Sequence, residues 1–268
     1  MDHRPIGVFD SGVGGLTVVK ELLQYGPNEK IIYFGDTARV PYGSKSKETV
    51  TKYAKQIARF LLTKNVKGLI VACNTMDSNS LEELQANFDV PIMGVVEPGA
   101  SMAAAATYNQ KVGVIGTEAT IKSQAYQKHI LKQASTIQVF GQACPLFVPL
   151  AEEGWLEDEI TYQVAKRYLS PLQLAHVDTI VLGCTHYPLI ESIIQKVMGD
   201  QVSVINPALE TVERFLDLLK NINGLREERS QPQHEFYVSD NPDKFSQLGS
   251  LILSYPLDKV KQVNIEKY

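Results

Sequence analysis

Short runs of apolar and β-branched residues alternate along the chain with stretches in which apolar residues recur every three or four positions. The short runs predict strands, and the periodic stretches predict amphipathic helices. The clearest helix face consists of Val50, Tyr53, Ala54, Ile57 and Leu61. The predicted strands are Ile6–Phe9, Lys30–Gly35, Gly68–Ala72, Pro91–Val96, Lys111–Ile115, Ile137–Phe140, Thr179–Gly183, Val202–Ile205 and Glu235–Val238.

Most of these strands are continuous apolar runs that do not alternate with polar residues. This pattern is typical of strands that helices cover on both faces of a mainly parallel sheet. Because helical patterns fill most of the gaps between the strands, the sequence predicts an α/β protein with doubly wound, mainly parallel sheets.

The chain also contains a degenerate internal repeat, with three segments recurring in the same order at offsets of 106, 111 and 109 residues. The repeat predicts two similar domains related by a pseudo-twofold duplication, with the active site in the crevice between them. The first domain is expected to comprise residues 1–97 and 208–268, and the second residues 98–207. The repeated pairs are Ile6–Ser11 with Val112–Thr117, Leu69–Thr75 with Ile180–His186, and Gly94–Gly99 with Ser203–Ala208.

Several predicted strands end in polar residues or glycine turns. In open α/β sheets the ligand crevice lies beyond the carboxyl ends of the strands. Helices that follow such strands direct free N–H groups into the crevice, which favours an anion such as a carboxylate. The polar residues at these strand ends are Asp10, Ser11, Asp36, Cys73, Asn74, Thr75, Glu97, Thr117, Cys184, Thr185 and His186.

The three cysteines are widely spaced and odd in number, so we expect neither a disulfide framework nor a C-x-x-C motif. Cys73 and Cys184 end equivalent strands of the repeat, and the duplication would place them on opposite sides of the crevice. Inverting a stereocentre needs one group that removes a proton and another that delivers one to the opposite face. Thiols can do both. Cys144 is followed by Pro145 and is expected to be a buried structural residue.

Asp10 and His186 lie near these thiols in sequence or topology, so we expect both to assist proton movement. Two simpler interpretations stay open. Asp10 is also suited to capping a helix or a turn, and His186 to making a structural hydrogen bond.

Charge and composition restrict the function classes. The 268 residues are 44% hydrophobic, and 26 basic against 30 acidic residues give a net charge of −4 without a basic run. Nucleic acid is therefore not an expected partner. The N-terminus leads directly into a strand and no apolar run is long enough to span a bilayer, so we expect a cytoplasmic protein without a membrane partner. A homodimer is compatible with the sequence, which does not set the oligomeric state.

Seven motifs follow one another along the chain: D-S-G-V-G-G-L-T-V at Asp10–Val18, P-Y-G at Pro41–Gly43, A-C-N-T at Ala72–Thr75, E-P-G-A at Glu97–Ala100, V-I-G-T-E-A-T-I at Val114–Ile121, A-C-P-L-F-V-P-L-A-E at Ala143–Glu152 and G-C-T-H-Y-P-L at Gly183–Leu189. Over nearly the whole chain they resemble glutamate racemase, of the aspartate/glutamate racemase superfamily. The resemblance implies two α/β domains with the substrate between them. It also implies an isomerase that interconverts L- and D-glutamate without a cofactor and supplies D-glutamate for peptidoglycan synthesis.

The resemblance also implies roles for individual residues. Cys73 and Cys184 match the two catalytic cysteines, and Asp10, Glu152 and His186 match the residues that assist acid–base chemistry. Substrate contacts are implied for Asp10, Ser11, Tyr42, Gly43, Asn74, Thr75, Thr117, Thr120, Thr185 and His186. No metal ligand is implied.

The sequence departs from the family pattern at Met76–Ser80, at Ser44–Ser46 and at Asn206–Ala208. In the first departure, Asn74 and Thr75 are expected to open a helix beyond the strand that carries Cys73. Ser80 and Glu83 have the spacing of a capping box, which favours a start of the regular helix at Ser80, with Met76–Asn79 as its entry turn. Asp77 would oppose an anionic substrate if it faced the crevice, so we expect it to lie off the substrate path in a first helical turn.

Other functions are less compatible with these residues. A dinucleotide fold would need a third glycine where Thr17 stands, and a pyridoxal-phosphate enzyme would need a Schiff-base lysine, for which there is no distinctive candidate. Zinc held by Cys73, Cys184 and His186 would match no standard ligand spacing. The remaining alternatives are a racemase for aspartate or another amino acid on the same fold, and a non-catalytic ligand-binding or regulatory protein.

Overall fold

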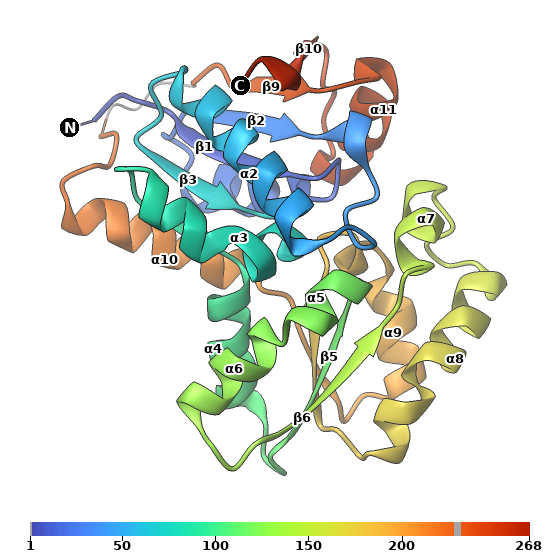
Figure 1. Cartoon of the computed structure of the whole chain (residues 1–268). Helices are drawn as coiled ribbons and strands as arrows, with labels where there is room; N and C mark the ends of the chain where they lie inside the picture. Colours follow the sequence, from blue (N-terminus) through green and yellow to red (C-terminus); the bar gives the residue numbers. More distant parts are fainter. Residues whose placement is uncertain (1, 228–231) are drawn as a thin grey trace.

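The computed structural model describes residues 2–227 and 232–268 and contains two parallel sheets (Figure 1). The first sheet has the order β10-β9-β2-β1-β3-β4 and the second the order β6-β5-β7-β8. We call the parts built on them the first and second domains. The strands of the first sheet are β1 (Ile6–Asp10), β2 (Ile31–Gly35), β3 (Gly68–Val71), β4 (Ile92–Gly94), β9 (Glu235–Val238) and β10 (Val260–Gln262); those of the second are β5 (Lys111–Gly116), β6 (Gln138–Ala143), β7 (Thr179–Gly183) and β8 (Ser203–Ile205).

The strand orders reproduce the internal repeat. In chain order, the first four strands of each domain are arranged second, first, third and fourth across the sheet, and every pairing is parallel. Leu69 and Ile180 therefore lie on equivalent central strands, as their matching sequence segments predict. The predicted α/β fold with two similar, mainly parallel sheets is confirmed.

Helices cover both faces of the first sheet. Alternate residues of β1 show how the faces are divided, because Ile6 and Val8 pack into one hydrophobic core and Phe9 into the other. One core includes α1 (Leu16–Tyr25), α10 (Ala208–Asn221) and α11 (Pro242–Leu253); the other includes α2 (Lys47–Leu62) and α3 (Asn74–Asn87).

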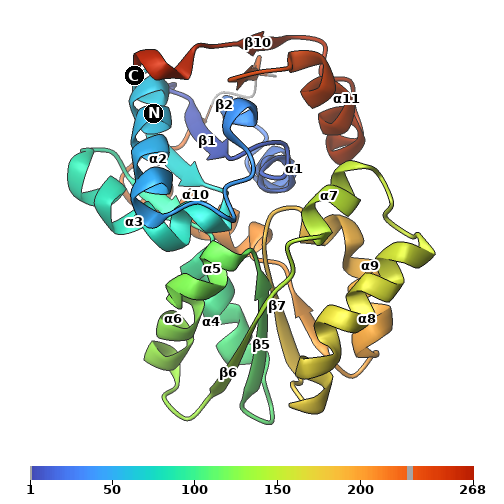
Figure 2. The same ribbon diagram turned by 45° about the vertical axis from the view of Figure 1, so that its right-hand side comes forward.

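The second sheet is covered in the same way, with one core on each face. Figure 2 shows that α7 reaches towards α11 of the first domain. No helix within the described residues combines the length and apolar character needed to cross a membrane. The helices of one face are α4 (Val96–Ala106) and α6 (Ala125–Gln133), with α5 (Glu118–Ser123) preceding α6; those of the other are α7 (Phe147–Glu152), α8 (Glu159–Leu174) and α9 (Glu191–Met198).

All nine predicted strands are present, with differences at their ends. The strand predicted over Pro91–Val96 ends at Gly94, and Val96 instead begins α4. The capping box predicted at Ser80 and Glu83 is wrong, because α3 begins at Asn74 and the Ser80 hydroxyl donates to the Met76 carbonyl inside the helix. The short edge strand β10 was not predicted from the sequence.

Candidate active site

A cavity of about 390 Å³ lies between the two domains, at the carboxyl ends of their central strands. The lining residues come from the segments after β1, β2, β3, β5, β6 and β7. They are Ser11, Val40, Pro41, Tyr42, Gly43, Ser44, Cys73, Asn74, Thr75, Thr117, Glu118, Pro145, Val148, Pro149, Glu152, Cys184, Thr185 and His186.

Eleven of the thirteen residues expected from the sequence are in this lining, and Asp10 and Thr120 lie behind it. The lining also contains residues that were not predicted individually. Pro41 belongs to the P-Y-G motif, Glu118 follows Thr117, and Val148 lies in the motif that ends at Glu152. Membership of these motifs was the available signal for them.

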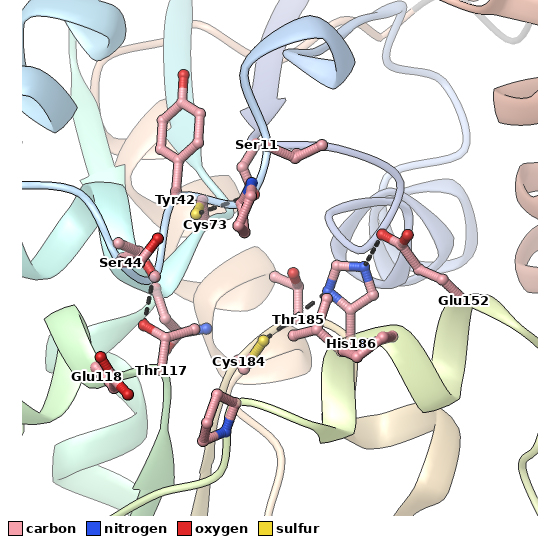
Figure 3. A pocket seen from close by; sticks show the side chains of 18 residues that line it. Ser11, Tyr42, Ser44, Cys73, Thr117, Glu118, Glu152, Cys184, Thr185 and His186 are labelled. Carbon is pink, nitrogen blue, oxygen red and sulfur yellow. Dashed lines mark hydrogen bonds and ion pairs between the residues drawn. The ribbon is translucent and has the colours of Figure 1, made fainter.

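Cys73 ends the β3 segment and occupies the N-cap of α3. Its Sγ lies 3.7 Å from Ser11 Oγ (Figure 3). Burial and the nearby Asp10 carboxylate raise the pKa of the Cys73 thiol, against the opposing effect of a hydrogen bond from the Met76 backbone N–H. These surroundings favour the protonated thiol of Cys73.

Cys184 has different partners. Its Sγ lies 3.8 Å from His186 Nδ1, and His186 Nε2 lies 3.1 Å from Glu152 Oε1 (Figure 3). Burial alone would lower the pKa of His186, but its hydrogen bonds to Cys184 and Glu152 raise that pKa to about 10. The hydrogen bond to His186 in turn lowers the pKa of Glu152. The raised pKa of His186 therefore places a positive charge beside the Cys184 sulfur.

Asp10 is fully buried, and its negative charge raises the pKa of both Cys73 and His186. Its carboxylate accepts hydrogen bonds from the Gly12 backbone N–H at 3.0 Å and from Thr185 Oγ1 at 3.3 Å. It therefore acts on the site through its charge and through Thr185, a residue of the second domain.

Three threonine hydroxyls join the domains at the opposite side of the cavity. Thr75 Oγ1 lies 2.8 Å from Thr117 Oγ1 and 3.3 Å from Thr120 Oγ1. Thr117 caps α5, and Thr120 is buried behind it. Gly43 also contacts this cluster, since a Cβ there would lie 2.7 Å from Thr117 Cβ. Hydroxyl donors at the starts of two helices are suited to binding a carboxylate.

Tyr42 presents its ring to the cavity and not its hydroxyl. The hydroxyl donates to Asp36 Oδ2, and Figure 3 shows it turned away from Thr117 and Cys184. Arg39 Nε also donates to Asp36 Oδ2, at 2.6 Å, and its guanidinium stacks over the Tyr53 ring. A substrate contact of Tyr42 would therefore be made by the ring.

Asp77 does not line the cavity, which agrees with the expectation that it lies off the substrate path. It is in the first turn of α3 but is buried there, accepting a hydrogen bond of 2.6 Å from the Val96 N–H at the start of α4. Burial raises the pKa of Asp77 to about 7. Asp77, which departs from the family pattern, thus joins α3 to the start of α4.

The other departures also have defined places. Ser44 lines the cavity, and Asn206 Oδ1 accepts a hydrogen bond from the Ala208 N–H at the start of α10. Cys144 is buried outside the lining, and burial raises the pKa of its thiol. Within the described ranges, no group of three or more His, Cys, Asp and Glu side chains is arranged to hold a metal ion.

Comparison with known proteins identifies the family. The profile of the Asp/Glu/Hydantoin racemase family matches residues 11–215. A glutamate racemase from Geobacter metallireducens is 50% identical over 99% of this chain and 98% of its own length. The crystal structure of the Francisella tularensis glutamate racemase with D-glutamate is 41% identical, covers 100% of both chains and superposes with a TM-score of 0.94. The RacE1 glutamate racemase of Bacillus anthracis is 37% identical over 98% of both chains, also with a TM-score of 0.94. The chain therefore belongs to the Asp/Glu/hydantoin racemase family and, within it, to the glutamate racemases.

Proposed function

We propose that this chain interconverts L- and D-glutamate by two proton transfers at Cα, in which one of Cys73 and Cys184 removes the Cα proton and the other delivers its own proton to the opposite face. The observation that carries the proposal is that the two thiols, contributed by equivalent strand ends of the two domains, line one cavity. Inversion at Cα requires an acid and a base on opposite faces of that carbon, and the crevice supplies one thiol from each wall.

The different surroundings of the thiols support a direction for each step. With L-glutamate, a Cys184 thiolate takes the Cα proton, and the electron pair of the C–H bond stays on Cα next to the carboxylate. The Cys73 thiol then gives its proton to the opposite face, which leaves a Cys73 thiolate and D-glutamate. The reverse reaction begins at Cys73. Asp10, Glu152 and His186 assist by stabilising the charge and orientation of the sulfur groups.

The polar lining is suited to a dicarboxylate. Ser11, Asn74, Thr75, Thr117 and Thr185 offer hydroxyl or amide donors, and Gly43 allows close approach near Thr117. Thr120 supports Thr117 from behind, and the Tyr42 ring closes one side. The cavity volume is within the range of small-molecule sites.

We also propose that residues 1–97 with 208–268 form the first domain and residues 98–207 the second. The near coincidence of these limits with the starts of α4 and α10 supports this division. The D-glutamate would feed peptidoglycan synthesis. The three free cysteines are compatible with action in the reducing cytoplasm.

Circular dichroism of the purified protein with each enantiomer of glutamate tests the proposal. We expect the signal of either enantiomer to decay to zero, without added cofactor and after dialysis against a chelator. Parallel assays with L- and D-aspartate test the alternative racemase. Turnover of aspartate alone, or loss of turnover on chelation with recovery on adding zinc, would contradict the proposal.

A further inference from the structure

Tyr126 is a buried residue of α6 that joins the second domain to the residue after Cys73. Its hydroxyl donates a hydrogen bond of 2.6 Å to Asn74 Oδ1, at the start of α3 in the first domain. Tyr126 is only 3% exposed and is absent from the lining of the cavity, whereas Asn74 is part of that lining. The contact therefore reaches the substrate cavity from behind.

The ring of Tyr126 is held in place by two glycines. A Cβ at Gly183, the residue before Cys184, would lie 3.2 Å from Tyr126 Cε2. A Cβ at Gly99 of α4 would lie 3.3 Å from Tyr126 Cε1. The ring thus packs against the strand end that carries one thiol, while its hydroxyl binds the neighbour of the other.

The hydrogen bond sets the orientation of the Asn74 amide. Oδ1 accepts the hydrogen bond from the Tyr126 hydroxyl. The other polar atom of the amide, Nδ2, therefore points away from Tyr126 with its two N–H donors. Among the described residues, Nδ2 has no protein acceptor, and the side chain lines the cavity. The opposite amide orientation would present an acceptor to an anionic substrate and leave the buried tyrosine hydroxyl without an acceptor.

We propose that Tyr126 is a positioning residue that fixes the Asn74 amide so that Nδ2 donates to a carboxylate of the substrate. The inference rests on the proposed function, because it assumes a dicarboxylate in the cavity. The Tyr126 hydroxyl, the group in question, acts through Asn74. Its contribution is therefore to substrate affinity, with little effect on the transfer of the proton between the sulfur atoms and Cα.

Replacement of Tyr126 by phenylalanine keeps the ring and removes the hydroxyl. We expect Y126F to raise KM for both enantiomers by about tenfold and to change kcat by less than about threefold, as expected for loss of ground-state binding. In an N74A background, Y126F should raise KM by less than about twofold, because its target is absent. Y237F is the matched control, since Tyr237 is also buried and donates 2.6 Å to Glu235 Oε2 outside the cavity lining.

Y126F in the wild-type background and Y126F in the N74A background together decide whether Tyr126 positions Asn74 or only supports the structure in general. An unchanged KM in Y126F, or an equal effect of Y126F with and without Asn74, would overturn the inference. Turnover by the wild-type protein tests the proposed function separately. If glutamate binds without turnover, the ratio of Kd values from calorimetry tests the inference with the same variants and the same tenfold expectation.

Discussion

Gly14 lies directly against His186: a Cβ at Gly14 would come within 2.7 Å of His186 Nδ1, the atom that faces Cys184, and would clash with Thr185 Oγ1. The glycine is therefore required by the close approach of the two domains. Gly14, a residue of the first domain, thus leaves the space that His186 occupies beside Cys184.

Substitution of Gly14 by alanine should displace His186 and lower kcat/KM for glutamate by tenfold or more. Steady-state kinetics and the pH dependence of kcat/KM measure this effect. Gly12→Ala is the matched control, since its Cβ would meet only Val40 Cγ1 at an ordinary 3.7 Å. Equal activities of the two variants would contradict this account of Gly14.

Alanine at either Cys73 or Cys184 should abolish racemisation, whereas Cys144→Ala should keep most of the activity. In D₂O, the variant without Cys184 should still exchange the Cα proton of D-glutamate without inverting it, because Cys73 remains as a base. The variant without Cys73 should exchange only L-glutamate. NMR measures the exchange, and near-normal turnover in Cys184→Ala would rule out the two-base mechanism.

The raised pKa of His186 gives a pH dependence with a definite sign. The pKa of His186 is about 10 in the folded protein, against an ordinary 6.5. The contribution of protonated His186 to the free energy of unfolding is therefore complete below about pH 6.5 and is lost as the pH rises through about 10. Glu152→Gln removes a group that raises this pKa. We expect the alkaline limb of the kcat/KM profile to move to lower pH in this variant. An unchanged limb would show that His186 does not control it.

Asp77→Ala should change KM for glutamate by less than about threefold, or about 0.65 kcal/mol, because Asp77 is absent from the cavity lining. Kinetics with both enantiomers provide the test. If affinity for glutamate became tenfold tighter or more, the wild-type carboxylate would have to act on the substrate.

Asp77→Asn should instead change the pH dependence of stability. The folded pKa of Asp77 is about 7 against an ordinary 3.8, so its stabilising contribution is present below about pH 3.8 and is lost as the pH rises through about 7. Relative to the wild type, the variant should gain up to roughly 4 kcal/mol of unfolding free energy across this interval. Urea unfolding at several pH values measures the gain, and parallel curves for the two proteins would contradict it.

The juxtaposition of Cys73 and Cys184 could be predicted from the sequence because the repeat places both at equivalent strand ends, and parallel topology brings such ends to one crevice. Ser80 was misread because the capping-box pattern is local, whereas the end of β3 fixes the start of α3 at Asn74. The short edge strand Val260–Gln262 gives too brief a pattern to identify.

Tyr126 could not be found by sequence reasoning for a different reason. It is 52 residues from Asn74 along the chain, and the two meet only when the domains pack together. Neither helical periodicity nor motif spacing encodes such a contact. The burial of Asp77 against α4 has the same origin, since its partner Val96 lies in another element.

The duplicated strand order has a consequence for symmetry. In a dimer of two identical halves, an exact twofold axis would give both sulfur atoms the same neighbours. Joining the halves in one chain removes that restriction, so each copy can diverge. Here one thiol has Ser11 as its neighbour and the other has His186, so the two sulfur atoms have different surroundings before any substrate arrives. Covalent fusion thus lets two equivalent positions acquire the different surroundings that the proposed acid and base require.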